Sequence, residues 1–179
     1  MVLRLVGSEM CIRDRSGIGK TTILRTIAGL EKLENGEIIL KDKIISSTNE
    51  NLEPEKRKIA LSFQENSLFP HHSIYKNIIL GIPKSGPKKI NVEEITKFLN
   101  IDHVLDKYPH QISAGEAQRA SLARSLCAEP DLLLLDEPLS NIDQNFKEEI
   151  QTKLKKIIKD LKITTIIVTH DSYEAFYLA

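Results

Sequence analysis

The chain has 179 residues, 25 Lys and Arg against 25 Asp and Glu, 41% hydrophobic residues and two cysteines. This length suits one domain, and the zero formal charge argues against a protein held to nucleic acid or to an anionic membrane by bulk electrostatics. No apolar run approaches the roughly 18 residues of a membrane span, no signal-peptide stretch opens the chain, and two cysteines cannot make a disulfide scaffold, so we expect a cytosolic globular domain.

The first fifteen residues differ from the rest of the chain. Residues 5–14 resemble a translated transposase adaptor, an oligonucleotide used to prepare sequencing libraries. A buried apolar strand normally leads into a phosphate-binding loop, but Glu9, Arg13, Asp14 and Arg15 occupy that position here. The alternative is a natural strand over residues 2–6 followed by an unusual turn. We interpret residues 1–15 as non-native, exclude them from the fold argument, and treat residues 16–179 as a partial domain cut at both ends.

Short elements are expected in the first half of the remaining chain. Residues 16–22 form a Gly-rich loop, and residues 22–29 predict a helix that ends at Gly29. Three short runs predict strands, over residues 37–40, 43–45 and 59–63. Helical pieces, including residues 92–99, are expected between residues 73 and 109 around a Pro/Gly/Lys loop at 81–89. With the next helix they predict a helical subdomain at about residues 73–128.

The second half has longer elements. Residues 113–128 predict a helix, which Ser113 and Glu116 open with a capping box. The uninterrupted apolar run Leu132–Leu135 predicts a strand buried on both faces of a parallel sheet. Apolar residues at helical spacing predict an amphipathic helix from about Gln144 to Leu161: Phe146, Ile150, Leu154, Ile157, Ile158 and Leu161. A β-branched strand follows at 164–169, and strand, helix, strand implies an α/β fold. Residues 170–179 predict the first part of a further helix.

The Gly-rich segment matches the second half of a P-loop. Glycines let backbone N–H groups converge on phosphate oxygens, and the helix N-terminus adds its positive dipole. Lys20 would reach the β- and γ-phosphates, and Thr21 would place its hydroxyl on Mg²⁺. The alternative is a Gly-rich helix entry with a solvated lysine. The candidate nucleotide-binding residues of this segment are Ser16, Gly17, Ile18, Gly19, Lys20, Thr21 and Thr22.

Two carboxylates follow the predicted buried strand. Asp136 and Glu137 stand at its C-terminal end, the edge at which open α/β sheets bind their ligands. Asp136 can hold Mg²⁺, and Glu137 can polarise an attacking water as a general base. The alternative is that these acids cap a following helix.

Beside these motifs, further segments resemble the ATP-binding subunit of ABC transporters, in the same order along the chain. They are the Q-loop region at 63–71, the family signature at 112–119, the Walker B strand at 132–137, the D-loop at 140–143 and the switch histidine at 169–171. The resemblance covers residues 16–179. It implies an α/β P-loop NTPase of the ABC type, with a mostly parallel sheet, an antiparallel β part and a helical subdomain.

The resemblance also implies roles for single residues. Gln64 would sense Mg²⁺ and the attacking water, and Thr21, Gln64 and Asp136 would surround the metal. His170 would hydrogen-bond the γ-phosphate and the catalytic water, although a histidine at the end of a strand is more commonly a cap or surface residue. The family signature would contact ATP bound to a second copy of the chain, through Ser113, Gly115 and Glu116. Asp143 would lie at the dimer interface.

The implied working unit is a head-to-tail homodimer with two ATP molecules at its interface. ATP binding closes the pair and hydrolysis opens it, because the ligand binds the two states with different affinity. The implied partners are transmembrane permease subunits and, indirectly, a solute-binding protein, with no nucleic acid. The chain would then be cytoplasmic and peripheral on the inner face of a bacterial membrane.

Two departures from the family pattern bear on activity. Ala114 replaces the first signature glycine, which a helical backbone tolerates. Asp14 and Arg15 stand where the family has Gly-Pro, and the expected upstream aromatic that stacks on adenine is missing. A non-Gly residue in left-handed backbone costs roughly 1–2 kcal/mol, and a carboxylate about 4 Å from a phosphate adds roughly 4 kcal/mol. Taken literally, this P-loop would bind ATP about a thousandfold or more too weakly.

Residues 54–57, 68–71 and 108–110, with Asn141 in the D-loop, look most like ferric-iron importers, and polyamine, sulfate and sugar importers are close relatives.

One alternative to a transport function is an ABC-type ATPase of DNA repair or translation. Repair-type members carry long insertions between P-loop and signature, whereas Lys20 and Ser113 are only 93 positions apart here. The other alternative, a regulatory module without catalysis, is disfavoured because Glu137 and His170 are both present.

Overall fold

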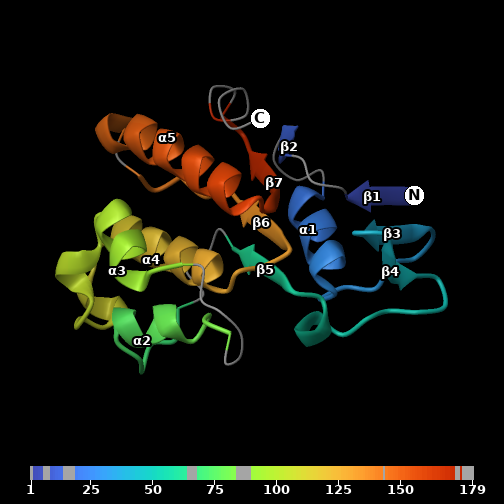
Figure 1. Ribbon diagram of the computed structural model, residues 1–179, viewed down its shortest axis with the longest axis horizontal. Helices are drawn as coiled ribbons and strands as arrows, with labels where there is room; N and C mark the ends of the chain where they lie inside the picture. Colours follow the sequence, from blue (N-terminus) through green and yellow to red (C-terminus); the bar gives the residue numbers. More distant parts are fainter. Residues whose placement is uncertain are drawn as a thin grey trace.

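The computed structural model describes two β-sheets and the helices around them (Figure 1). The residues described are 2–5, 9–13, 19–63, 68–83, 90–142, 144–171 and 174. For residues 2–5, 9–13 and 144–145 the description is limited to the backbone. Within these ranges, no helix has the length and apolar character needed to cross a lipid bilayer.

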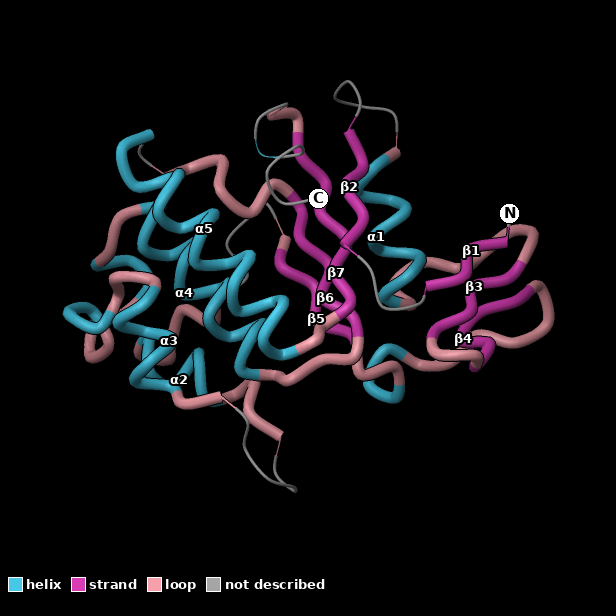
Figure 2. The backbone as a smooth tube through the Cα atoms, turned by 45° about the horizontal axis from the view of Figure 1, so that its top comes forward, coloured by secondary structure: helices cyan, strands magenta, loops and turns pink. Residues whose placement is uncertain are grey.

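The helices fall on both sides of the larger sheet. In chain order they are α1 (Lys20–Ala28), α2 (Ile74–Ile79), α3 (Val92–Phe98), α4 (Ala114–Cys127) and α5 (Gln144–Leu161). Short 3₁₀ turns stand at Pro54–Lys56, Asp102–Val104 and Pro109–Gln111. Figure 2 shows α1 on one side of the larger sheet and α4 and α5 on the other.

The larger sheet is parallel throughout, with the strand order β2-β7-β6-β5. Its strands are β2 (Glu9–Arg13), β5 (Ile59–Ser62), β6 (Leu132–Asp136) and β7 (Thr164–Thr169). Parallel neighbours need a crossover connection, and α5 supplies it between β6 and β7. Every residue of β6 and β7 is buried, so the predicted central strands and their crossover helix are confirmed.

Each face of this sheet has its own hydrophobic core. Successive side chains of a strand point to opposite faces, so β6 contributes to both. Leu132 and Leu134 pack in the same cluster as residues of α1, whereas Leu133 and Leu135 pack with residues of α4 and α5. The helices α2 and α3 join the second cluster, mainly through Ile78 and Ile95.

The smaller sheet has the order β1-β3-β4 and covers the α1 side. Its strands are β1 (Val2–Leu5), β3 (Glu37–Leu40) and β4 (Lys43–Ser47). β3 and β4 are antiparallel and are joined by Lys41 and Asp42, both in left-handed backbone with φ of 48° and 62°. The predicted strands are confirmed, with β4 two residues longer than expected.

The structure corrects two expectations. α1 begins at Lys20, two residues before the predicted start, because Gly19 with φ +85° turns the chain directly into the helix. Phe146 was expected on the buried face of α5 but is 47% exposed. In residues 1–15, which we interpret as non-native, β1 pairs with β3 and β2 pairs with β7, both in parallel. The predicted helix at the end of the chain lies outside the described residues, apart from Glu174.

In the described part of the chain, β2 lies at the edge of the larger sheet. Charged side chains are common on edge strands. The charges at positions 9 and 13 are therefore compatible with a paired strand. The other two charges of this segment, Asp14 and Arg15, lie outside the described residues.

A buried arginine fastens the smaller sheet to the C-terminal end of α1. Arg57 is 3% exposed, and its Nη1 donates to the carbonyl oxygens of Thr26 (3.3 Å) and Ile27 (2.8 Å). Its Nη2 donates to Ser46 Oγ (2.9 Å) and Asn51 Oδ1 (2.7 Å). These contacts add donors to carbonyls of the last turn of α1, where Thr26 O also accepts from Gly29 N–H at 3.1 Å, and place a cation at the negative end of the helix. The same side chain fixes one sheet and one helix.

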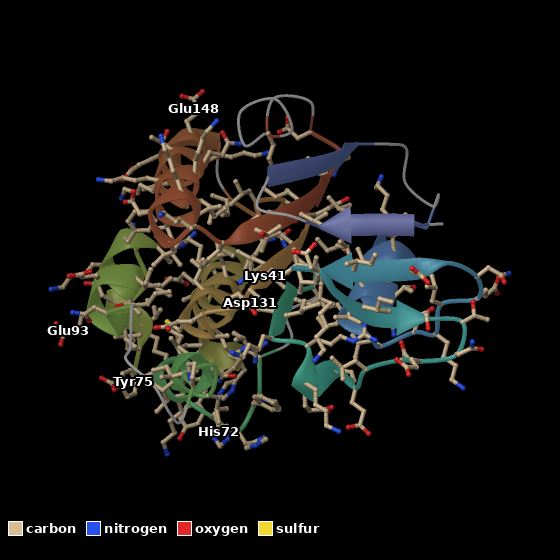
Figure 3. All side chains as sticks on the ribbon, turned by 45° about the vertical axis from the view of Figure 1, so that its right-hand side comes forward. Lys41, His72, Tyr75, Glu93, Asp131 and Glu148 are labelled. Carbon is tan, nitrogen blue, oxygen red and sulfur yellow. The ribbon has the colours of Figure 1, made fainter. Side chains whose placement is uncertain are left out.

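We expect Arg57→Met to lower the free energy of unfolding by about 3 kcal/mol or more, because several buried acceptors would lose their donor at once. Urea unfolding of the two proteins measures the difference. The matched control is Lys41→Met, which removes a 2.6 Å ion pair to Asp131 on the surface (Figure 3). The lysine side chain is 59% exposed, so its loss should cost less than about 1 kcal/mol. Equal effects in the two variants would contradict the role assigned to Arg57.

Candidate functional site

The first residues of α1 meet the last residue of β6. Thr21 Oγ1 donates a hydrogen bond of 2.7 Å to Asp136 Oδ2. Lys20 precedes it and is only 8% exposed, whereas Thr22 is exposed. The contact joins residues 115 positions apart in the sequence. The predicted P-loop helix and the predicted Walker B strand are therefore adjacent.

Asp136 is a carboxyl group held in a buried position. It is 4% exposed, and burial raises its pKa above the ordinary value. The hydrogen bond from Thr21 lowers the pKa, the charge of Glu137 raises it, and the charge of Lys20 lowers it, with burial the largest effect. A buried carboxylate of this kind is stabilised by a nearby cation.

The oxygen atoms at this contact suit Mg²⁺. Mg²⁺ is commonly bound through one or two carboxylates and a hydroxyl, together with substrate phosphates. Thr21 and Asp136 place a hydroxyl and a carboxylate within hydrogen-bond distance of each other. The donor set and its spacing therefore fit the metal that the sequence implied.

Glu137 leaves β6 with an unusual backbone. Its φ is +48°, a left-handed conformation that costs a non-Gly residue about 1–2 kcal/mol. Its N–H still donates to the carbonyl oxygen of Val168 on β7 (2.8 Å), so the backbone is fixed at the sheet edge. The alternative in which these acids cap the next helix is wrong, because the chain turns over residues 137–142 and α5 begins only at Gln144.

The side chain of Glu137 points toward the switch histidine. Its Oε1 lies 3.1 Å from Nδ1 of His170, with the two side chains 17% and 61% exposed. His170 follows β7 directly. The carboxylate and the imidazole thus lie at the same end of the sheet as the buried Asp136.

The signature segment forms a second group at the start of α4. Ser113 caps the helix: its Oγ accepts from Glu116 N (3.3 Å), and its N–H donates to Glu116 Oε2 (2.8 Å). The predicted capping box is confirmed. Ser113 Oγ also donates to Glu116 Oε2 (2.6 Å), and His103 Nε2 lies 2.9 Å from Oε1. Hydrogen bonds from the Ser113 hydroxyl, then its backbone N–H, are the main causes that lower the pKa of Glu116 to about 2.

The two small residues of the signature differ in how much space they have. Ala114 is the first residue of α4 and has helical backbone, as expected, so its methyl group is tolerated. A Cβ on Gly115 would lie 2.9 Å from the carbonyl oxygen of Asn141. Only glycine fits the second position without a shift of the neighbouring loop.

The structure brings together most of the predicted site residues that it describes. Lys20, Thr21, Asp136, Glu137 and His170 cluster at the carboxyl edge of β6 and β7, while Ser113, Gly115 and Glu116 lie at the start of α4. Gly19 is the N-cap residue of α1 and has left-handed backbone, and Thr22 lies in the first turn of the helix. The remaining predicted residues lie outside the described part of the chain: Ser16, Gly17, Ile18, Gln64 and Asp143.

Three polar residues that hold this edge in place had no role in the sequence analysis. Gln118 bonds to the loop after β6. Lys147 Nζ contacts Asp171 Oδ2 at 2.5 Å, and buried Glu174 accepts from Thr169 Oγ1 at 2.7 Å. A polar residue on the apolar face of a helix, such as Gln118, indicates that its side chain is hydrogen-bonded inside the protein. The sequence does not show which residue is the partner.

An apolar strand that ends in two acids, beside a helix that opens with Gly-Lys-Thr, is the arrangement of a P-loop NTPase. The family model described as "ABC transporter" matches residues 7–140, more than half of the chain. The chain belongs to the ABC transporter family, as a member of its ATP-binding domains.

Proteins of known function agree with this assignment. The chain is 39% identical over 177 residues to the "Fe(3+) ions import ATP-binding protein FbpC 2" of Haemophilus influenzae, which covers 97% of this chain and 50% of that protein. It is 39% identical over 178 residues to the "sn-glycerol-3-phosphate import ATP-binding protein UgpC" of Psychromonas ingrahamii, covering 97% and 46%. The chain spans about half the length of the curated relatives it matches.

A solved structure with the same fold is the ATP-binding cassette MJ0796, in a dimeric post-hydrolysis state bound to ADP and Pi. Its TM-score is 0.83 at 29% identity, covering 98% of this chain and 80% of that chain. The predicted fold class, an ABC-type P-loop α/β domain, is confirmed.

The low pKa of Glu116 predicts a pH-dependent contribution to stability. A carboxyl whose pKa falls from 4.5 to about 2 on folding stabilises the folded state above pH 4.5. This contribution is lost as the pH falls from 4.5 toward 2. We expect the difference in unfolding free energy between the wild type and Glu116→Gln to shrink over this window, measured by urea unfolding at a series of pH values. A difference that stays constant between pH 6 and about 3 would contradict the assignment.

Proposed function

We propose that this chain is the ATP-hydrolysing part of a bacterial import system, working as a head-to-tail pair beneath a membrane permease. The observation that carries the proposal is the Thr21–Asp136 hydrogen bond beside Glu137 and His170. It brings a phosphate-binding helix, two acids and a histidine to one edge of a parallel sheet. The relatives named above are import ATP-binding proteins, and the solved cassette is a dimer with ADP and Pi.

The residues of the site divide the work of hydrolysis among them. The N-terminus of α1 and the charge of Lys20 hold the β- and γ-phosphates of ATP. Thr21 and Asp136 would hold Mg²⁺, which would neutralise charge on the phosphates. Glu137 accepts the proton of the attacking water, and His170, 3.1 Å from it, orients that water against the γ-phosphate.

The second nucleotide contact comes from another copy of the chain. Ser113, Gly115 and Glu116 form a separate group at the start of α4, whose described contacts run to His103 and Asn141. In a head-to-tail dimer this group closes over the ATP held by the partner's P-loop. Gln64 and Asp143 complete the site in this proposal, with Gln64 beside Mg²⁺ and Asp143 at the interface.

Ferric iron is the solute that we propose. Ferric-iron import proteins of Haemophilus influenzae and Fusobacterium nucleatum are 39% and 40% identical to the chain. Glycerol-phosphate and sulfate import proteins have similar identity, and the solute contacts other subunits. Uptake of Fe³⁺, sn-glycerol 3-phosphate and sulfate into vesicles that contain the complete transporter distinguishes among the three.

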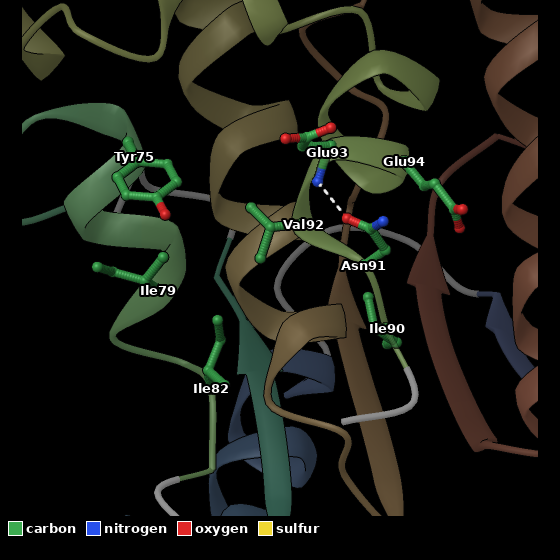
Figure 4. A pocket seen from close by; sticks show the side chains of 8 residues that line it. All are labelled: Tyr75, Ile79, Ile82, Ile90, Asn91, Val92, Glu93 and Glu94. Atoms are coloured by element: carbon green, nitrogen blue, oxygen red, sulfur yellow. Dashed lines mark hydrogen bonds between the residues drawn. The ribbon is translucent and has the colours of Figure 1, made fainter. Parts of the chain in front are cut away.

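The permease docks in a groove between α2 and α3. The groove has a volume of about 890 Å³ and is lined by Tyr75, Ile79 and Val92, with Glu93 and Glu94 beside them (Figure 4). Tyr75 is 46% exposed and lines the groove beside the partly buried Ile79 and Val92. Cytoplasmic loops of membrane proteins are rich in Lys and Arg. A basic, amphipathic permease helix therefore matches both the apolar lining and the acidic residues.

The residues before the P-loop decide whether this chain is active as it stands. We take residues 1–15 as foreign and the natural residues at positions 14 and 15 as Gly-Pro. Support comes from the resemblance of residues 5–14 to an adaptor and from the acid at position 14. Sequencing the gene across its 5′ end from the source DNA tests this. An apolar strand that runs into Gly-Pro-Ser-Gly supports it, and a genuine Asp14-Arg15 favours a weakly binding, regulatory chain.

In a full-length protein with Gly-Pro at positions 14 and 15, we expect Glu137→Gln to lower kcat about 100- to 10,000-fold, because the general base is lost. ATP binding should remain, so the protein accumulates as an ATP-bound dimer that light scattering detects. Lys20→Ala is the control, since without phosphate binding it should stay monomeric with ATP. Turnover of Glu137→Gln at the normal rate would exclude Glu137 as the base.

We expect Tyr75→Ala to weaken binding to the permease about 30-fold, since a central aromatic anchor contributes about 2 kcal/mol to an interface. Co-purification with the detergent-solubilised permease measures the loss, and the ATPase activity of the isolated subunit should not change. Ile44→Ala is the matched control, since Ile44 is also 46% exposed but lies on β4. Permease binding that is unaffected by Tyr75→Ala would place the docking surface elsewhere.

A further inference from the structure

One buried side chain of α4 reaches the loop that carries the two acids. Gln118 is 2% exposed. Its Nε2 donates to the carbonyl oxygen of Glu137 (2.8 Å) and to Ser140 Oγ (3.2 Å), and its Oε1 accepts from the N–H of Asn141 (3.0 Å). The amide therefore uses both its donors and its acceptor on one loop. The loop also closes on itself, because Ser140 N–H donates to the carbonyl oxygen of Glu137 at 3.2 Å.

The same loop touches the signature segment at a second point. A Cβ on Gly115 would lie 2.9 Å from the carbonyl oxygen of Asn141, so helix and loop are in backbone contact there. Gly115 and Gln118 are three positions apart and share one face of α4. Two independent contacts, one steric and one through hydrogen bonds, make the start of α4 and residues 137–141 a single unit.

Packing alone does not explain a glutamine at this position. An apolar side chain of similar size fills the same buried space without the cost of burying an amide. The amide adds a directional hydrogen bond. It fixes the carbonyl group of Glu137, a residue whose backbone is left-handed with φ +48°. The orientation of the Glu137 carboxylate depends on that backbone.

We infer that Gln118 is a positioning residue that couples the two ATP sites of the dimer. This inference rests on the proposed function, in which Ser113 and Gly115 contact the ATP of the partner while Glu137 acts on the chain's own ATP. When the partner's ATP draws the start of α4 toward itself, Gln118 carries the movement to the backbone of Glu137. Each nucleotide then acts on the catalytic glutamate of the other site.

The test uses the full-length subunit, with Gly-Pro at positions 14 and 15, assembled with its permease. Gln118→Met keeps the volume and removes all three hydrogen bonds. Gln118→Glu keeps an acceptor for Asn141 but loses the donor to Glu137, and serves if the first variant does not fold. The matched control is Gln151→Met, because Gln151 is 1% exposed on α5 and its Nε2 has no hydrogen-bond partner within the described structure.

The wild type should hydrolyse ATP with a Hill coefficient above unity. In both Gln118 variants we expect kcat to fall about 10- to 100-fold, the effect of a small misplacement of a catalytic group. The Hill coefficient should fall toward unity, while the affinity for a fluorescent ATP analogue changes less than about twofold, since the P-loop is untouched. Gln151→Met should keep both the rate and the cooperativity of the wild type.

Different results overturn different claims. A wild-type complex without ATPase activity overturns the proposed function, and this inference falls with it. An active wild type with unchanged kcat and Hill coefficient in the Gln118 variants overturns the inference alone. The inference also fails if Gln151→Met loses cooperativity to the same extent, because the effect would then be one of packing.

Discussion

The structure depends on one strand that is buried on both faces. β6 lies between β5 and β7, and all five of its residues are buried. Alternate side chains enter separate cores, with α1 on one side and α4 and α5 on the other. A strand of consecutive leucines satisfies both cores at once, and no alternating strand would do so. The position of every helix named in the site follows from this requirement.

The acidic residues of the site stand at the C-terminal end of β6, directly after its leucines. In the register of β6 and β7, Asp136 pairs with Val168, so the residues that follow each strand emerge side by side. Glu137 and His170 are brought within 3.1 Å in this way. Because α1 packs against one face of the same strand, its first turn reaches Asp136 and the Thr21 contact forms. Burial of that carboxyl raises its pKa, and a cation bound there would offset the cost of burial.

Sequence patterns predicted the bounds of those helices and strands in which apolar residues recur at a clear spacing. The bounds of α5 and β7 matched the prediction because their patterns are long and their ends are marked. α1 started earlier than predicted, since Gly19 serves as both loop residue and helix cap. Phe146 was wrongly predicted to be buried. Helical spacing places it on the apolar face of α5, but it lies near the start of the helix, where it is 47% exposed. Gln118 could not be assigned, because its partners belong to a loop that is distant in sequence.

The segments that follow the parallel strands β6 and β7 are held by polar side chains of the helices. These helices, α4 and α5, pack on the same face of the sheet. Gln118 of α4 bonds to backbone groups of the loop after β6, and Lys147 of α5 pairs with the side chain of Asp171 in the segment after β7. α1 packs on the opposite face. Glu137 and the segment after His170 are therefore tied to helices on one face of the sheet, and the P-loop helix lies on the other.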